Sequence, residues 1–108
     1  MSGGEEALVV FVTSPSAEKA LELGRTLVEE RLAACASLLP AIRSVYWWEG
    51  KVQEEGEALV LLKTTRARFG ALRDRVLTLH PYQVPEVVAV EVAAGNPAYL
   101  EWIVGETR

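Results

Sequence analysis

Two side chains that each occur once, Cys35 and His80, are the first candidates for chemistry. A single cysteine can serve as a soft metal ligand or a reactive thiol, although among alanines it is more often a small buried hydrophobe. His80 follows an expected helix, where its imidazole can cap the helix end as readily as it can bind a metal. One cysteine and one histidine cannot complete a metal site alone, so such a site needs Glu86, a backbone group or residues from another subunit.

Lys63 and the two adjacent tryptophans are further candidates. Lys63 ends a buried strand just before a helix, a position that can hold an anion but that is equally typical of a solvated strand end. Trp47 and Trp48 alternate across an expected hairpin, so one should face the domain and the other should face outward. Hairpin packing is the simpler interpretation of both tryptophans.

The sequence contains none of the common catalytic or phosphate-binding motifs that we considered. GxGxxG, GxxxxGKS/T, GxSxG, HExxH and CxxC are all absent. A nucleophile pair of Cys35 and His80 would lack a third group to orient it. We therefore expect a binding protein rather than an enzyme.

The elements that must position these residues follow from the hydrophobic periodicity. Continuous β-branched runs predict strands, and apolar spacings of three and four predict amphipathic helices. Gly24 on a buried helical stripe predicts close approach of that helix to its sheet, Pro40 predicts an interrupted strand, and Gln53–Gly56 predicts a polar irregularity. In chain order we expect a strand over 7–13, a helix capped by Ser14 and running to about Ala33, strands over 35–48 and 52–64 around a turn at 49–51, a helix over 66–79 stopped by His80 and Pro81, a strand over 84–92 and a helix over 98–104 that begins after Asn96.

This order, β-α-β-β-α-β plus a terminal helix, predicts an α+β fold of the ferredoxin-like split βαβ type. The 108 residues should form one domain with an ordered core over about 7–104. Two helices would cover one sheet face, yet the strands are apolar on both sides and the hairpin is long. An apolar open face and unpaired edges predict a homo-oligomer.

Charge and composition restrict the partners. The formal net charge is −4 and the basic residues form no run, which argues against nucleic acid. The longest strictly apolar run, Ala7 to Val12, is far shorter than the roughly 20 residues of a membrane span. The acidic start, Met1 to Glu6, lacks the basic region of a signal peptide, so we expect a cytoplasmic protein. The surplus of glutamate and arginine is typical of heat adaptation and, equally, of a GC-rich genome.

Five segments, in this order, closely resemble the CutA family of divalent-cation tolerance proteins. They are Glu30–Cys35, Tyr46–Lys51, Leu62–Thr64, His80–Tyr82 with Pro85–Glu86, and Tyr99–Trp102. The resemblance implies a trimer whose architecture is shared with the PII signalling proteins, and a cytoplasmic protein associated with tolerance to copper and other divalent metals. It implies no obligatory cofactor, with a divalent metal such as copper as the bound ion.

The resemblance also implies the site residues, which would gather at clefts between subunits. The ligand-binding cleft would comprise Cys35, Trp48, Lys63, Tyr82 and Glu86, and the metal site would comprise His80 and Glu86. Some members carry a cysteine where this chain has Val12, and a second histidine where it has Leu79. Both differences remove ligands that copper favours.

The leading hypothesis is a homotrimeric protein of metal homeostasis that binds a divalent metal or a small ligand at these clefts. The alternative is a PII-like signalling module that binds an anionic effector, through Lys63, or a partner protein. A third hypothesis is an enzyme with Cys35 as its nucleophile, which requires fast alkylation of that thiol.

Overall fold

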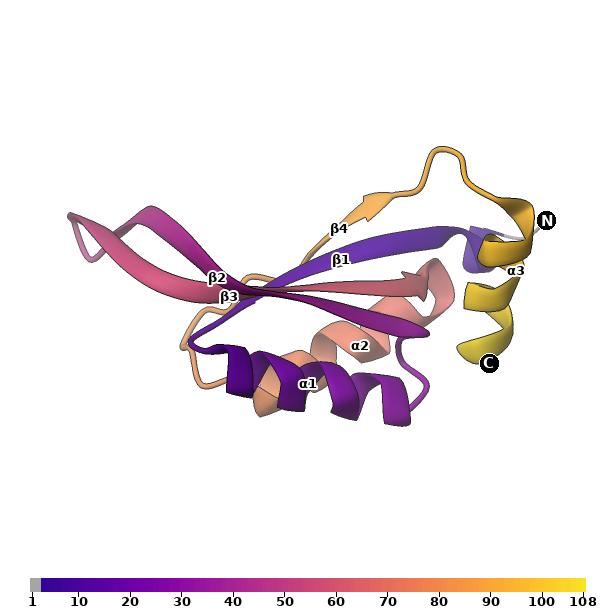
Figure 1. Ribbon diagram of the computed structural model, residues 1–108, viewed down its shortest axis with the longest axis horizontal. Coiled ribbons are helices and arrows are strands. Elements are labelled where there is room, and N and C mark those ends of the chain that lie inside the picture. The colour runs from indigo at the N-terminus through magenta and orange to yellow at the C-terminus, as the bar shows by residue number, and fades with distance from the viewer. Residues whose placement is uncertain (1–2) are drawn as a thin grey trace.

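The computed structural model describes residues 3–108, an antiparallel four-stranded sheet with α1 and α2 on one face (Figure 1). Met1 and Ser2, the start of the acidic N-terminal stretch, lie outside the described residues. The spatial strand order is β2-β3-β1-β4, so an antiparallel strand splits each βαβ unit. The α+β fold and its element order are therefore as predicted. The elements are η1 (Gly3–Glu5), β1 (Ala7–Ser14), α1 (Ala17–Glu29), β2 (Cys35–Trp48), β3 (Lys51–Thr65), α2 (Arg66–Leu79), β4 (Val88–Glu91) and α3 (Pro97–Glu106).

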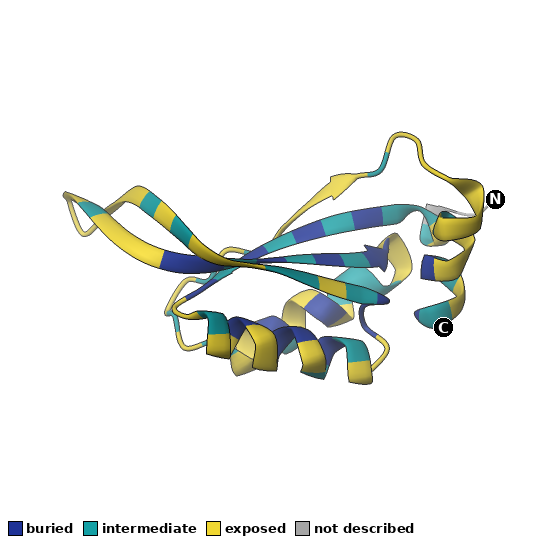
Figure 2. Ribbon diagram, in the orientation of Figure 1, coloured by how far each residue is buried: buried dark blue, intermediate teal, exposed yellow. Residues whose placement is uncertain are grey.

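The core lies between the sheet and the two helices. Alternate residues of β1 and β3 are buried there, as the banding along these strands in Figure 2 shows. Burying each aliphatic side chain stabilises the fold by about 1.5–3 kcal/mol. The fully buried members are Val10, Val12, Val60, Leu62, Leu27, Leu72 and Val76.

The opposite sheet face is apolar but has no helical layer over it. Val9 and Phe11 of β1 and Leu59 and Leu61 of β3 are only partly buried. On β4, both valines of the strand are about half exposed. The expectation of strands that are apolar on both sides is confirmed, and within residues 3–108 no helical layer covers this open sheet face.

The β2–β3 hairpin projects beyond the helices (Figure 1). Trp48 pairs with Lys51, and both loop residues, Glu49 and Gly50, have positive φ, 52° and 76°. A tight two-residue hairpin turn requires this left-handed geometry, to which glycine is suited. Trp47 is 73% exposed, whereas Trp48 is 39% exposed, which confirms that the two side chains face different environments.

The interruption at Pro40 is confirmed, but the irregularity predicted at Gln53–Gly56 is wrong. The register shifts between Leu39 and Ile42, so the extra residue lies in β2. Residues 53–56 pair regularly with 43–46 of β2. Proline cannot donate to the ladder, and this single bulge accounts for the bend of the hairpin away from the body.

Three other boundaries differ from the predicted ones. Ser16, not Ser14, caps α1 by accepting a 3.1 Å hydrogen bond from the Lys19 N–H, because Ser14 is still paired within β1. The helix stops at Glu29, just before Arg31 takes a φ of 63°. The last strand is limited to Val88–Glu91, since 84–87 do not pair with β1.

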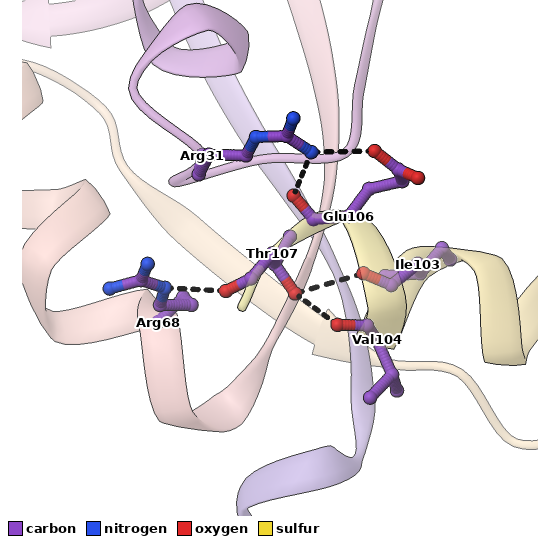
Figure 3. Close-up of polar contacts among 6 residues, drawn as sticks. All are labelled: Arg31, Arg68, Ile103, Val104, Glu106 and Thr107. Carbon is purple, nitrogen blue, oxygen red and sulfur yellow. Dashed lines mark hydrogen bonds and ion pairs between the residues drawn. The ribbon is translucent and has the colours of Figure 1, made fainter.

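The terminal helix begins after the Asn96 cap, as predicted, and its far end is held by two arginines (Figure 3). Arg31 Nη1 donates to Glu106 Oε2 at 2.6 Å, and Arg68 Nε donates to the Thr107 carbonyl at 2.6 Å. Two guanidinium groups at the negative end of the helix dipole are favourable. They fix α3 at the end of the sheet, with Ile103 buried.

Gly24 of α1 provides a test of the helix-to-sheet contact. A Cβ at Gly24 would lie 2.9 Å from the Cβ of Ala36, whereas a Cβ at Gly70 of α2 would meet only the tip of Arg73 at 4.0 Å. We expect Gly24→Ala to lower the free energy of unfolding by about 1–3 kcal/mol despite the better helix propensity of alanine. The matched control, Gly70→Ala, should instead raise it by up to about 1 kcal/mol. Urea denaturation measures both, and equal effects of the two substitutions would contradict the close contact.

Candidate functional site

A cleft of about 840 Å³ lies between the hairpin and the segment that follows α2. It contains three of the predicted site residues, Trp48, Tyr82 and Glu86. The turn at Glu49 brings Trp48 to the hairpin side, and the chain leaving α2 at Pro81 brings Tyr82 and Glu86 to the opposite side. The structure therefore brings together residues that lie more than 30 positions apart in the sequence.

The cleft is strongly acidic. Four carboxylates line it, and no lysine or arginine is among its lining residues. Within residues 3–108, none of these four carboxylates forms an ion pair. Such a concentration of one sign favours cations and disfavours anions. The four residues are Glu49, Glu55, Glu57 and Glu86.

A short hydrogen bond joins the two sides of the cleft. The Tyr82 hydroxyl donates to Glu57 Oε2 at 2.6 Å, and Glu57 is only 8% exposed. Burial, and then the hydrogen bond to Glu57, raise the pKa of Tyr82 well above its ordinary value, so the phenol keeps the proton that it donates. Burial and the nearby Glu55 raise the pKa of Tyr46 in the same direction.

Glu86 is a solvent-exposed carboxyl group of the cleft whose ionised form is nevertheless disfavoured. Burial raises its pKa first, and the neighbouring charge of Glu57 raises it further. Both effects penalise the ionised carboxylate. A bound cation would remove this penalty, because it supplies the opposite charge at short range.

His80 is close to this cleft but does not line it. Its Nε2 donates to the Thr13 carbonyl at 2.7 Å, since a carbonyl can only accept, and its Nδ1 accepts from the Tyr82 N–H at 3.1 Å. The two rings are 4.6 Å apart. Both ring nitrogens are therefore engaged, and a metal ion on His80 would first have to displace one hydrogen bond. In this arrangement His80 positions Tyr82, while its assignment as a metal ligand stays a prediction.

Cys35 and Lys63 form a second group near the other end of the sheet. They face each other across β2 and β3, with Lys63 Nζ 3.1 Å from Ser37 Oγ and 4.0 Å from Cys35 Sγ. Burial, then the nearby Cys35, raise the pKa of Tyr99 of α3. About 20 Å of strand, from Lys63 back to Glu57, separates this group from the acidic cleft. Within one chain, the predicted ligand-binding residues thus fall into two groups.

Two arrangements considered from the sequence, a Cys35–His80 nucleophile pair and an enclosing group of metal ligands, are not formed by the described residues of one chain. Cys35 lies opposite Lys63, which pairs with Val9, whereas His80 contacts Thr13 further along β1, so the two do not form a nucleophile pair. No group of three or more His, Cys, Asp or Glu side chains in residues 3–108 is arranged to enclose a metal ion. No described helix is both long and apolar enough to span a membrane.

Sequence reasoning missed part of the cleft, namely Glu55, Glu57 and Tyr46. The alternation of β3 was the available signal. Glu55 and Glu57 lie two positions apart, so they share one face of the strand and extend the row that contains Leu59, Leu61 and Lys63. Interpreting Gln53–Gly56 as an irregular segment concealed this row.

Comparison with known proteins identifies the family. Residues 8–106 match the profile of the family described as "CutA1 divalent ion tolerance protein". The chain belongs to this family. It is 50% identical over 95 residues to the divalent-cation tolerance protein CutA of Thermus thermophilus, which covers 88% of this chain and 92% of that protein. The solved structure of Cut A1 from the same organism superposes with a TM-score of 0.92 at 48% identity, covering 94% of this chain and 99% of that chain.

A plant relative extends the comparison. Protein CutA 1, chloroplastic, of Oryza sativa is 45% identical over 102 residues, which cover 94% of this chain and 58% of that longer protein. CutA1 membership confirms the resemblance in the sequence and makes this chain a member of a divalent-cation tolerance family rather than of a named enzyme family. Because this relative is described as chloroplastic, membership alone does not assign a compartment.

The raised pKa of Glu86 predicts a pH-dependent stability. A carboxyl group whose folded pKa exceeds its unfolded pKa contributes stability at low pH that is lost as the pH rises through the folded value. We expect Glu86→Gln, which cannot ionise, to raise the Tm slightly at pH 7.5, since solvent screens the exposed carboxylate, and to leave it unchanged near pH 4. Thermal melts across this range measure the difference.

The control is Glu101→Gln, an exposed residue of α3 outside the cleft. It should leave the Tm unchanged at both values of pH. A Glu86→Gln variant that melts below the wild type at pH 7.5 would contradict the account of Glu86 as a strained charge.

Proposed function

We propose that this divalent-cation tolerance family member acts in metal homeostasis as a cytoplasmic homotrimer that binds a divalent cation in the acidic cleft. The observation that carries the proposal is the set of four carboxylates in one cleft without a cationic side chain among the lining residues. A divalent ion there would relieve the repulsion between Glu57 and Glu86.

The donor chemistry indicates how such an ion would be held. Carboxylate and phenol oxygens are hard ligands, and the cleft offers no soft ligand of its own. With no enclosing group of ligands in the described residues, the ion would keep part of its water shell and exchange readily. For copper, we propose that His80 joins Glu86 once its Nδ1 gives up the Tyr82 N–H.

Two features support the homotrimer. The open sheet face is apolar, and the projecting hairpin exposes Val45, Trp47 and Val52 at 66%, 73% and 57%. Apolar surface of this extent, away from the core, is typical of an interface. A ring of subunits would also bring the Cys35–Lys63 group of one chain near the cleft of another, as the ligand-binding cleft inferred from the sequence requires.

The alternative function, a PII-like module for an anionic effector or partner protein, is favoured by a single observation. Lys63 donates to Ser37 and forms no ion pair within residues 3–108. An anionic effector would have to bind at Lys63, because the acidic cleft would repel it.

Calorimetric titration of metal-free protein tests the leading proposal. We expect Mn(II), Zn(II) and Cu(II) each to bind at about one ion per chain, with Kd between about 1 μM and 1 mM. Glu86→Gln should lower the affinity for each of the three ions by about ten-fold, because it removes a charged oxygen ligand. Glu101→Gln should change none of them.

The variant His80→Ala distinguishes copper, which favours nitrogen ligands, from manganese, which favours oxygen ligands. If His80 ligates copper, this variant weakens Cu(II) binding and leaves Mn(II) binding intact, because manganese prefers oxygen ligands. If none of the three ions binds to the wild type, the proposal is wrong. Melting shifts produced by nucleotides and lost in Lys63→Ala would favour the alternative instead.

A further inference from the structure

The acidic cleft is much larger than a metal ion, and part of its wall is aromatic. Its volume of about 840 Å³ lies within the range of sites that hold small organic molecules. Three aromatic side chains, Tyr46, Trp48 and Tyr82, line it together with the carboxylates. Aromatic ring faces attract organic ammonium groups, whereas a divalent metal ion is held by oxygen ligands. The cleft is therefore suited to an organic cation in both size and chemistry.

The pairing of the hairpin sets carboxylates and aromatic rings side by side on one face. Glu55 and Glu57 are two positions apart on β3, which separates them by about 7 Å along the strand. On the neighbouring β2, Tyr46 and Trp48 pair with position 53 and with Lys51 of the same row, so their rings share this face. Lys51 lies next to the turn and does not line the cleft. An acidic row beside an aromatic row suits an elongated ligand whose charged and apolar parts alternate.

Glu57 lines this cleft with a buried carboxylate of which only one oxygen has a partner. The residue is 8% exposed, and its Oε2 accepts the Tyr82 hydroxyl at 2.6 Å. Within residues 3–108 the carboxylate accepts no other hydrogen bond and forms no ion pair. Because no fully buried side-chain oxygen of these residues lacks a partner, Glu57 Oε1 is not enclosed by protein and faces the cleft. A buried carboxylate without a counter-charge gains most from a cation beside it.

We propose that the acidic cleft binds a linear aliphatic polyamine. Two successive ammonium groups lie at Glu57 and Glu55. The methylenes beside them cover the rings of Tyr46 and Trp48. An aliphatic segment of about three or four carbons between two nitrogens spans close to the separation of these carboxylates. The inference rests on the proposed function only in taking this cleft as a cation site, and it adds a second class of cation that would compete with the divalent ion.

Calorimetric titration of metal-free protein with spermidine tests both the charge and the shape of the ligand. Hexaamminecobalt(III) is one control, since it carries the same charge in a compact ion, and n-butylamine is the other, with a single ammonium group. We expect spermidine to bind at about one molecule per chain, with a Kd of about 1–100 μM and about ten-fold more tightly than either control. Equal affinities for spermidine and hexaamminecobalt(III) would overturn the inference, because acidic charge alone would then account for the binding.

Two tryptophan substitutions test the aromatic wall. Trp48→Leu should lower the affinity for spermidine by about three-fold or more, because it removes a ring face beside the ammonium groups, and it should leave Mn(II) binding unchanged. Trp47→Leu is the matched control, since Trp47 is 73% exposed and lies on the opposite face of the same strand, outside the cleft. It should bind spermidine as the wild type does. Equal affinities of the two variants would overturn the inference.

Two glutamate substitutions test the acidic row. Glu55→Gln should lower the affinity for spermidine by about three- to ten-fold, because it removes one of the charges that the ammonium groups meet. Glu54→Gln, the same change at the preceding residue of β3 and outside the cleft, should have no effect. Because Glu55 is exposed, this pair keeps the inference testable if circular dichroism shows that Trp48→Leu does not fold. The inference is wrong if both glutamate variants bind spermidine equally well.

Failure of the inference and failure of the proposed function give different results. If Mn(II) binds and spermidine binds no more tightly than n-butylamine, the inference is overturned and the proposed function stands. If spermidine binds through Trp48 and Glu55 while Mn(II) does not bind, the metal proposal is wrong and the inference stands. Absence of binding by both cations would overturn both.

Discussion

The two-residue period of β3 is the constraint on which the rest of this structure depends. The strand is 15 residues long and pairs with both β1 and β2, so its alternation decides what lies on each face of the sheet. One set of residues, including Val60 and Leu62, builds the core beneath α1 and α2. The other set starts at Lys51 and Gln53 near the hairpin turn and continues through two glutamates and two leucines to Lys63 and Thr65. A shift of one residue in register would exchange the two sets and destroy core and site together.

A chain of hydrogen bonds connects this sheet to the cleft. The Thr13 carbonyl accepts from His80, His80 accepts from the Tyr82 N–H, and the Tyr82 hydroxyl donates to Glu57. The segment after α2 is thereby tied at one end to β1 and at the other to β3. The single histidine therefore holds Tyr82 in position through its ring nitrogens. The buried Glu57 carboxylate, which would be costly alone, is satisfied by the phenol.

Much of the fold could be predicted from local signals in the sequence. Pro40, Asn96 and the stop at His80–Pro81 each act through short-range sterics or capping, and the structure agrees at each of them. The errors arose where tertiary pairing decides. Ser14 is a good cap by type, but its pairing in β1 leaves the role to Ser16. The segment 84–87 has strand-like residues but no partner strand.

The sequence indicated residues of the candidate site better than it indicated how they are arranged in space. The sequence indicated Trp48, Tyr82 and Glu86, which share a cleft. Cys35 and Lys63 lie in a separate group within one chain, and their place at a cleft between subunits stays a prediction. Glu55 and Glu57 were missed because acidic residues on a hairpin are usually solvated. Their importance depends on Tyr46 and Tyr82, whose positions follow from tertiary contacts.

Anomalous diffraction from crystals soaked with Mn(II) and, separately, Cu(II) tests the central claim most directly. We expect an anomalous peak for Mn(II) inside the acidic cleft, at about 2.1–2.6 Å from carboxylate oxygens of Glu86 and its neighbours. A cleft without a peak, with the metal instead on the Cys35 thiol or on His80 alone, would contradict it.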